Sequence, residues 1–281
     1  MSIKIITDST SDINLDLAKE LDITIVPLRV IFDEQEYFDG VDITNEQFYE
    51  KLVISKNLPT TSQPAPEQYI PYFEEAKAKG DSVIVITISS KLSGTYQSAV
   101  IAKDMVEYED IHIVDSLTVT LGLQLLVRKA ITLKNQGMSA EAIAVQLENT
   151  KTKVKLYALL ESLEYLKKGG RLSGMSAFAG GLLNIKPIIE VRDGEVSLAA
   201  RARGLSGGYS KLFELITQDK GINRNEEVCI GYSAKKDNMK AFINNYKETL
   251  NLHDFIESPI GSVVGTHTGP GVCGFAFFQN E

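Results

Sequence analysis

Apolar residues in the first half of this chain follow two alternating patterns. Short runs rich in β-branched residues, at 3–7, 23–32, 83–88 and 111–115, are typical of buried strands in a parallel sheet. Between these runs, apolar residues recur at helical spacing, as in residues 122–136. The alternation predicts an α/β unit whose helices cover both faces of a parallel sheet.

Helix-boundary residues refine the prediction for this half. Thr44 and Gln47 form a T-x-x-Q capping box at the start of one predicted helix. A second helix is predicted over residues 66–80, where Gly80 suits the C-terminal end. Pro71 lies inside that helix, so we expect a kink there, because an interior proline removes a backbone hydrogen bond.

The second half has a different pattern. Two apolar runs meet at Asp193 and Gly194, the dipeptide that a type I′ hairpin turn prefers. Further helices and strands follow without regular alternation, which is typical of an α+β unit with an antiparallel sheet. We therefore expect a Rossmann-like α/β domain over residues 1–160 and an α+β domain over 161–281, with the boundary near Leu160.

Composition narrows the classes of function. Acidic residues outnumber basic ones by 37 to 29, so a nucleic-acid backbone is a poor partner. No apolar stretch approaches the ~20 residues that span a bilayer, and the first ten residues lack a signal-peptide core, so we expect a cytoplasmic protein. Cys229 and Cys273 lie far apart without C-x-x-C spacing, which predicts reduced cysteines rather than a zinc site.

A loop rich in hydroxyl groups follows the strand at 83–88. Its hydroxyl-bearing residues at the predicted start of a helix are Ser89, Ser90, Ser93 and Thr95. One such hydroxyl commonly serves as an N-cap, but a cap needs only one, and Gly94 would let a ligand approach the backbone closely. The surplus predicts a site for an anion at a helix N-terminus.

Two other loops carry candidate ligand groups. Residues 265–271 (GTHTGPG) predict an irregular backbone that would let His267 project into a cleft. Thr61, in the loop PTTSQPAP, is a second candidate donor. Taken singly, His267 is as well explained as an ordinary hydrogen-bonded histidine, and Thr61 as an N-cap residue.

Other motifs favour binding over catalysis. Asp8 and Asp12 follow the first strand and could hold a metal, but the same residues form Asx turns, which we favour. The chain has neither a P-loop motif nor a G-x-S-x-G nucleophile elbow. Between two glycine pairs, residues 175–179 are small and apolar; Met175 and Phe178 there could pack against a helix or wall an apolar channel.

Five motifs in this order resemble the DegV family over essentially the whole chain. They are TDSTSD, TTSQP, SSKLSGTYQSA, LEYLKKGGRLSG with LLNIKP, and GTHTGPG. The resemblance implies a long-chain fatty acid bound between the two domains. It implies that Thr61, Ser93, Gly94 and His267 contact the carboxylate.

The resemblance also implies a partner. The better understood members are fatty-acid-binding subunits of a bacterial fatty acid kinase, which serves phospholipid precursor metabolism. They offer the carboxylate to a separate subunit that supplies ATP and Mg²⁺, and they need no cofactor of their own. Arg201 and Arg203 alternate along a predicted strand, so they share one face, and we interpret that face as a docking surface.

Two alternatives remain open. The chain could be a stand-alone hydrolase or transferase with Ser93 as nucleophile and His267 as base, which predicts an orienting acid beside His267. It could also be a fatty-acid carrier or sensor without a kinase. We further expect neutral donors around the carboxylate, because an oxygen that attacks phosphorus should not be held in an ion pair. Arg171 would contradict this if it reached the site.

Overall fold

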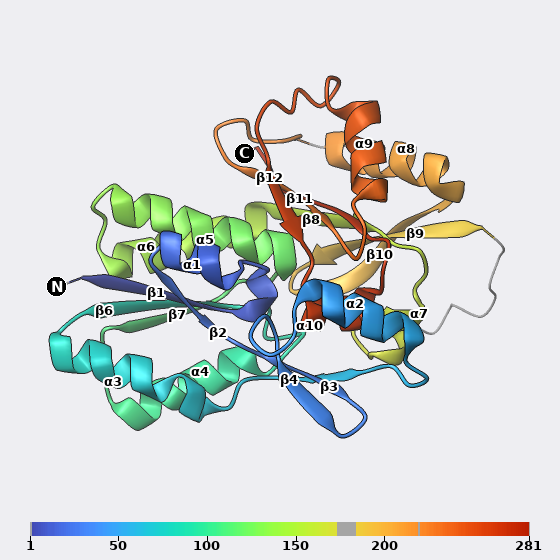
Figure 1. The fold of residues 1–281 in the computed structure, drawn as a ribbon. Helices are drawn as coiled ribbons and strands as arrows, with labels where there is room; N and C mark the ends of the chain where they lie inside the picture. The colour runs from blue at the N-terminus through green and yellow to red at the C-terminus, as the bar shows by residue number, and fades with distance from the viewer. Residues whose placement is uncertain (1, 173–183, 219, 281) are drawn as a thin grey trace.

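The computed structural model describes residues 2–172, 184–218 and 220–280. A four-stranded parallel sheet forms the core of the N-terminal half (Figure 1). In spatial order its strands are β2 (Ile23–Val26), β1 (Ile3–Asp8), β6 (Ser82–Thr87) and β7 (Ile111–Asp115). All three pairings are parallel, as the sequence predicted.

Helices cover both faces of this sheet (Figure 1). One face packs against α1 (Leu15–Glu20), α5 (Thr120–Asn135) and α6 (Ala140–Thr150), the other against α3 (Ile70–Lys79) and α4 (Thr95–Val106). The packing of β6 explains why the sequence at 83–88 is apolar on both sides of the strand. Ile84 and Ile86 join the cluster of α5 and α6, whereas Val83 and Val85 join that of α3 and α4. Both faces of the strand are therefore buried.

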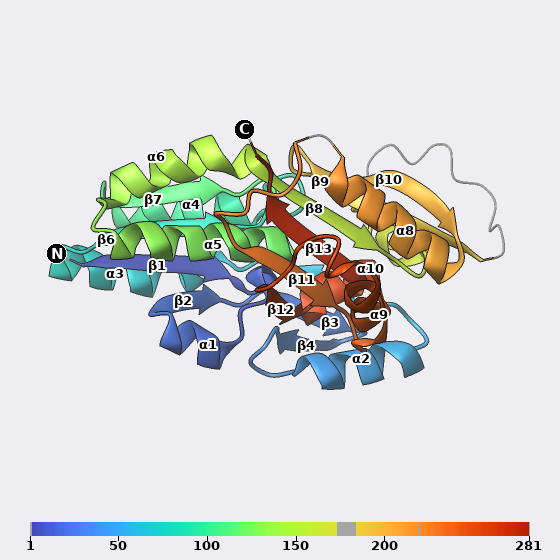
Figure 2. The ribbon, with the colours of Figure 1, turned by 90° about the horizontal axis from the view of Figure 1, so that it is seen from above.

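A six-stranded mixed sheet forms the core of the second half (Figure 2). Its spatial order is β10 (Glu195–Arg203), β9 (Ile185–Arg192), β8 (Val154–Leu159), β13 (Cys273–Phe278), β11 (Val228–Tyr232) and β12 (Ile256–Pro259). Only the β11–β12 pair in this sheet is parallel. Helices α8 (Gly204–Thr217) and α9 (Asp237–Tyr246) pack on one of its faces. The α/β plus α+β fold class is confirmed.

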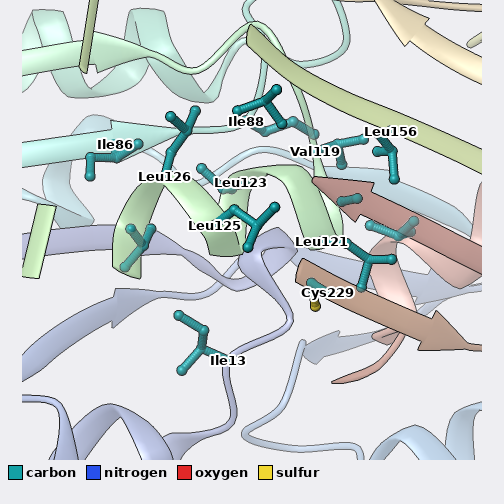
Figure 3. Close-up of a cluster of buried hydrophobic side chains, with 14 of the residues drawn as sticks. Ile13, Ile86, Ile88, Val119, Leu121, Leu123, Leu125, Leu126, Leu156 and Cys229 are labelled. Atoms are coloured by element: carbon teal, nitrogen blue, oxygen red, sulfur yellow. The ribbon is translucent and has the colours of Figure 1, made fainter. Parts of the chain in front are cut away.

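Helix α5 joins the two sheets through one buried cluster (Figure 3). Leu126 lies toward Ile86 of the parallel sheet, and Leu121 lies toward Cys229 of the mixed sheet. Gly231 allows the close approach, since a Cβ there would lie 2.6 Å from the Leu121 side chain. Residues 120–127 of α5 are all buried, and only Thr120 and Gln124 among them are polar, as is typical of a helix segment enclosed on all sides.

The sequence predicted one strand over residues 23–32, but the structure has two separate strands there. Pro27 separates them, because a proline cannot donate to a strand ladder. The second part is β3 (Arg29–Phe32), which belongs to a separate antiparallel sheet with β4 (Gln35–Phe38) and β5 (Thr60–Ser62). The expectation of a loop at β5 was therefore wrong. Helix α2 (Asn45–Ile54) packs against this small sheet.

The capping box of Thr44 and Gln47 is confirmed, and Gly80 ends α3 at a φ of 66°. The helix predicted over residues 66–80 is divided just before Pro71. Residues 66–68 form a separate 3₁₀ turn, and α3 begins anew at Ile70. Pro71 thus lies in the first turn of α3, where its missing N–H removes no helical hydrogen bond.

The hairpin prediction is confirmed at the β9–β10 turn. Asp193 and Gly194 have φ values of 51° and 85°, and a type I′ turn requires positive φ at both positions. Strand β8, which ends one residue before Leu160, pairs with β9 and β13 of the second sheet. The division into residues 1–160 and 161–281 stays a prediction. No helix in the described part of the chain is long and apolar enough to cross a membrane.

Candidate functional site

A cavity of about 330 Å³ lies between the carboxyl end of β6 and the six-stranded sheet. Most of its wall is apolar. Val119 and Leu121 contribute from the start of α5, Leu156 from β8, and Ile189 and Val191 from β9. The volume is in the range of ~300–1,000 Å³ that is usual for small-molecule sites, and the position fits ligand binding beyond the strand ends of an α/β sheet.

Polar residues from four separate segments line the same cavity. Thr61 lies in β5, Ser93 and Gly94 precede α4, Arg171 follows α7 (Glu164–Lys168), and His267 lies in α10 (Ser262–Thr268). The fold therefore brings together all four residues predicted to contact a carboxylate. That they bind a carboxylate stays a prediction.

His267 lies in the last turn of α10, so the expectation of an irregular loop around it was wrong. The helix forms because Val263 and Val264 are buried along it. Backbone irregularity follows the helix instead, with Gly269 and Gly271 at φ values of 74° and 83°. A helix holds the imidazole more firmly than a glycine-rich loop would.

The imidazole of His267 contacts Thr61 and is enclosed. Its Nε2 lies 3.0 Å from the Thr61 hydroxyl. Burial, assisted by the nearby guanidinium of Arg171, lowers the pKa of His267 to about 4, so the ring is neutral at pH 7. Its Nδ1 is buried and has no hydrogen-bond partner among the described residues. Gly169 packs so closely that a Cβ there would lie 2.2 Å from Nδ1.

Arg171 reaches the site, although its residue is exposed. Its Nε donates to the Leu92 carbonyl at 3.3 Å, and one terminal nitrogen donates to the Gly169 carbonyl at 2.7 Å. The expectation of neutral donors alone is therefore wrong. A fixed positive charge stands at the polar end and would favour an anion there.

The hydroxyl-rich loop is used differently from expectation. Ser89 Oγ donates to the Gly194 carbonyl at 2.8 Å, and Ser90 Oγ donates to the Asp115 carboxylate at 2.5 Å. These two residues attach the loop to the β9–β10 turn and to β7. Ser93 lines the cavity, and its Oγ lies 2.8 Å from Thr95 Oγ1. Only part of the surplus of hydroxyls is thus available to a ligand.

A family model described as "Uncharacterised protein, DegV family" matches residues 2–280. The chain belongs to the DegV family. It is 39% identical over 280 residues to a DegV domain-containing protein of Caldanaerobacter subterraneus subsp. tengcongensis, and the match covers 99% of each chain.

Several solved structures share this fold. One, described as showing fatty acid binding of a DegV family protein from Thermus thermophilus, has 34% identity and a TM-score of 0.89 over 100% of both chains. A stearic acid-binding protein from Eubacterium ventriosum has 30% identity and a TM-score of 0.88 over 99% of this chain and 98% of that one. Fatty Acid Kinase B3 protein from Streptococcus pneumoniae, loaded with linoleic acid, shares the fold at 24% identity and a TM-score of 0.86, with 100% of both chains covered.

The geometry of this DegV-family site does not form a Ser–His pair. His267 Nε2 contacts Thr61, whereas the Ser93 hydroxyl contacts Thr95. No carboxylate orients Nδ1 of His267 within the described residues. The stand-alone enzyme alternative predicted such an acid.

Asp8 serves a turn, as we favoured. Its carboxylate accepts hydrogen bonds from the backbone N–H of Thr10, at 3.0 Å, and from that of Ile88, at 2.7 Å. The same prediction is wrong for Asp12, whose carboxylate accepts hydrogen bonds from distant residues, among them Gly261 N–H at 2.9 Å. Within residues 2–172, 184–218 and 220–280, no group of three or more His, Cys, Asp or Glu side chains is arranged to hold a metal ion.

The remaining candidates lie outside the polar end. Met175 and Phe178 fall outside the described residues. Arg201 and Arg203 are exposed and alternate along β10, so they share one face of an edge strand. Their role in docking stays a prediction.

Sequence reasoning missed two residues of the site. Gln63 lines the cavity beside Gly94, where a Cβ would lie 2.1 Å from its Oε1. Its position inside the TTSQP motif was the available signal. Thr120 also lines the cavity, at a φ of 49°. No local pattern marked it, because its importance arises from contacts with segments distant in the sequence.

Proposed function

We propose that this chain binds a long-chain fatty acid, with the acyl chain against the apolar wall and the carboxylate at the polar end. The observation that carries the proposal is an apolar cavity that ends at Thr61, Ser93 and His267, beside Arg171. Each buried CH₂ contributes ~0.8 kcal/mol, so a long chain would be held tightly. The carboxylate loses water on entry, and the hydroxyls, the imidazole and the guanidinium replace its hydrogen bonds.

The relatives support this proposal. The Thermus thermophilus protein is described as binding fatty acid, and the Eubacterium ventriosum protein as binding stearic acid. Both share at least 30% identity with this chain over almost its whole length. Thr61, Ser93 and His267, which line the cavity, provide hydrogen-bond donors of the kind that a carboxylate needs.

A pair of lipids that differ only in the head group tests recognition of the carboxylate. Palmitate and 1-hexadecanol would be added separately to delipidated protein, and the melting temperature measured. A ligand at 100 times its Kd stabilises the folded state by about 2.7 kcal/mol. We expect palmitate to raise the melting temperature clearly more than hexadecanol does. Equal shifts would contradict carboxylate recognition, and no shift with either lipid would contradict lipid binding.

We further propose that the chain presents the bound carboxylate to a separate ATP-using kinase subunit. In that reaction a carboxylate oxygen attacks the γ-phosphorus of ATP, so that acyl phosphate forms and ADP leaves. ATP and Mg²⁺ belong to the partner, and this chain needs no cofactor. The sequence motifs and the fold shared with the Streptococcus pneumoniae protein support this step.

Labelled ATP, Mg²⁺ and palmitate, with and without a cognate kinase subunit, test the partnership. We expect labelled acyl phosphate only when both proteins are present. Acyl phosphate formed by this chain alone would favour the stand-alone enzyme. Binding of palmitate without phosphorylation by the kinase would favour a carrier or sensor.

A further inference from the structure

Helix α10, which carries His267, begins at two carboxylates from the first half of the chain. The backbone N–H of Gly261 donates to Asp12 Oδ1 at 2.9 Å, and that of Ser262 donates to Asp39 Oδ1 at 3.1 Å. Gly261 itself has no side chain that could cap the helix. The two carboxylates satisfy N–H groups that a helix start otherwise leaves unpaired.

Asp12 links α10 to the start of α5 as well. Its other oxygen accepts a hydrogen bond from the hydroxyl of Thr120, which lines the cavity. Thr120 has a φ of 49°, a conformation that a β-branched residue adopts only where its surroundings hold it. Asp12 therefore holds together two helices that form part of the cavity wall.

The small antiparallel sheet of β3, β4 and β5 contacts both ends of α10, and Asp39 makes the contact at the helix start. Asp39 directly follows β4, and its backbone N–H donates to the Leu28 carbonyl at 2.9 Å. At the other end of α10, His267 contacts Thr61 of β5, in the same sheet. The hydroxyl of Tyr49 adds a hydrogen bond to the Ile260 carbonyl at 3.0 Å.

We infer that Asp12 and Asp39 are positioning residues, which hold α10 so that the His267 imidazole stays enclosed against Thr61 and Gly169. They act through the helix start and do not touch the ligand. The inference rests on the proposed function in one respect only, that His267 contacts the carboxylate of a bound fatty acid. The position of the ring itself can be measured without any ligand.

The titration of His267, followed by NMR in delipidated protein, reports whether the ring is enclosed. In the wild type, burial lowers its pKa to about 4. We expect Asp12→Ala and Asp39→Ala to raise that pKa toward the ordinary value of about 6.5, because a displaced ring is hydrated. Burial raises the pKa of both aspartates, so removing whatever negative charge they carry would lower the pKa of His267 or leave it unchanged. A rise therefore separates displacement of the ring from loss of charge. His112 and His253 serve as internal references in the same spectra.

Two variants control for general destabilisation. Asp39→Asn keeps one acceptor oxygen for Ser262 N–H, so it should retain a His267 pKa closer to the wild-type value than Asp39→Ala does. Asp8→Ala removes a neighbouring buried carboxylate whose hydrogen bonds go to Thr10 and Ile88 and not to α10. We expect it to destabilise the fold without raising the pKa of His267. An equal rise in Asp8→Ala would overturn the inference.

Ser262→Pro keeps the inference testable if an alanine variant does not fold. Proline is favoured at the first position of a helix, and the preceding Gly261 has the extended conformation that precedes proline. The substitution removes the Ser262 N–H, one of two backbone N–H groups of α10 that donate to Asp39, and leaves Asp39 in place. A raised His267 pKa supports the inference, and a value that stays near 4 overturns it. Failure of wild-type protein to bind palmitate would overturn the proposed function and leave this result standing.

Discussion

The hydroxyl of Thr61 lies 3.0 Å from Nε2 of His267, although 206 positions separate the two residues in the chain. The contact joins β5 in the first half to α10 in the second. It therefore closes the polar end of the cavity across both halves of the molecule. A change in how the halves pack would alter the spacing of these two groups and, with it, the fit of a carboxylate.

Removing a hydroxyl from the polar end should weaken fatty-acid binding. Thr61→Val and Ser93→Ala each delete one candidate donor while nearly preserving side-chain shape. We expect each to reduce palmitate affinity by about 1–3 kcal/mol, or roughly 5- to 150-fold, in a binding titration. Ser90→Ala is the matched control, because Ser90 donates to Asp115 and does not line the cavity. Unchanged affinity in both Thr61→Val and Ser93→Ala would show that these hydroxyls only stabilise local structure.

Displacing the imidazole without changing it should also weaken fatty-acid binding. In Gly169→Ala the new methyl group would lie 2.2 Å from His267 Nδ1, so the ring must move from its contact with Thr61. We expect palmitate affinity to fall by about 10-fold or more, measured by calorimetry. Gly207→Ala in α8 is the control, since its nearest neighbour atom would lie 3.7 Å away. Wild-type affinity in Gly169→Ala would contradict this position for the ring.

Asp8 should give the stability of the fold a characteristic pH dependence. Burial raises the pKa of its carboxyl from 3.8 to about 6, although hydrogen bonds from Thr10 and Ile88 oppose the shift. The folded state thus keeps a proton between about pH 4 and pH 6 that the unfolded state has lost, so stability rises as pH falls through this window. The change is on the order of 3 kcal/mol.

Asp8→Asn removes this titration, so its deficit in free energy of unfolding relative to wild type should be largest near pH 4. The deficit should shrink as pH rises toward 7. Urea denaturation of both proteins at pH 4.5 and pH 7.5 measures it. A deficit that is constant, or that grows with pH, would show that Asp8 is ionised in the folded protein throughout this range.

The docking surface predicts an effect on phosphorylation that is separate from binding. Arg201→Glu combined with Arg203→Glu should lower the rate of acyl-phosphate formation with the kinase subunit at least about 10-fold, because opposite charges steer association. Palmitate affinity should be unchanged. The control is Lys19→Glu combined with Lys56→Glu, which changes the net charge by the same amount at exposed positions in the first half. Equal rates in the two double variants would rule out a specific role for the arginines.

The parallel sheet and its helices could be predicted because each apolar run packs against helices on both faces of the sheet. Val83 and Ile84 pack into different clusters, so the run had to be apolar throughout. The small antiparallel sheet could not be predicted in the same way. Its strand β5 has only three residues, and it exists because β3 lies beside it. Pairing between distant segments leaves no local pattern in so short a strand.

The candidate site shows the same division. Thr61, Ser93 and His267 stand in motifs that a reader can recognise, and the fold brings them to one cavity. The helical setting of His267 could not be predicted, because the glycines that follow α10 suggested a loop around it. The roles of Asp12 and Asp39 were hidden for another reason. Their partners, Gly261 and Ser262, lie 249 and 223 positions further along the chain.

Mass spectrometry of the lipid released from the purified protein tests the central claim most directly. The apolar wall favours retention of an acyl chain acquired during expression, since its burial removes many CH₂ groups from water. After denaturing extraction, we expect about one fatty acid per chain, with roughly 14 to 18 carbons, a range that the family resemblance implies and that gives enough tail burial for tight retention. Recovery of short polar metabolites alone, from a protein whose melting temperature palmitate does not raise, would contradict fatty-acid binding.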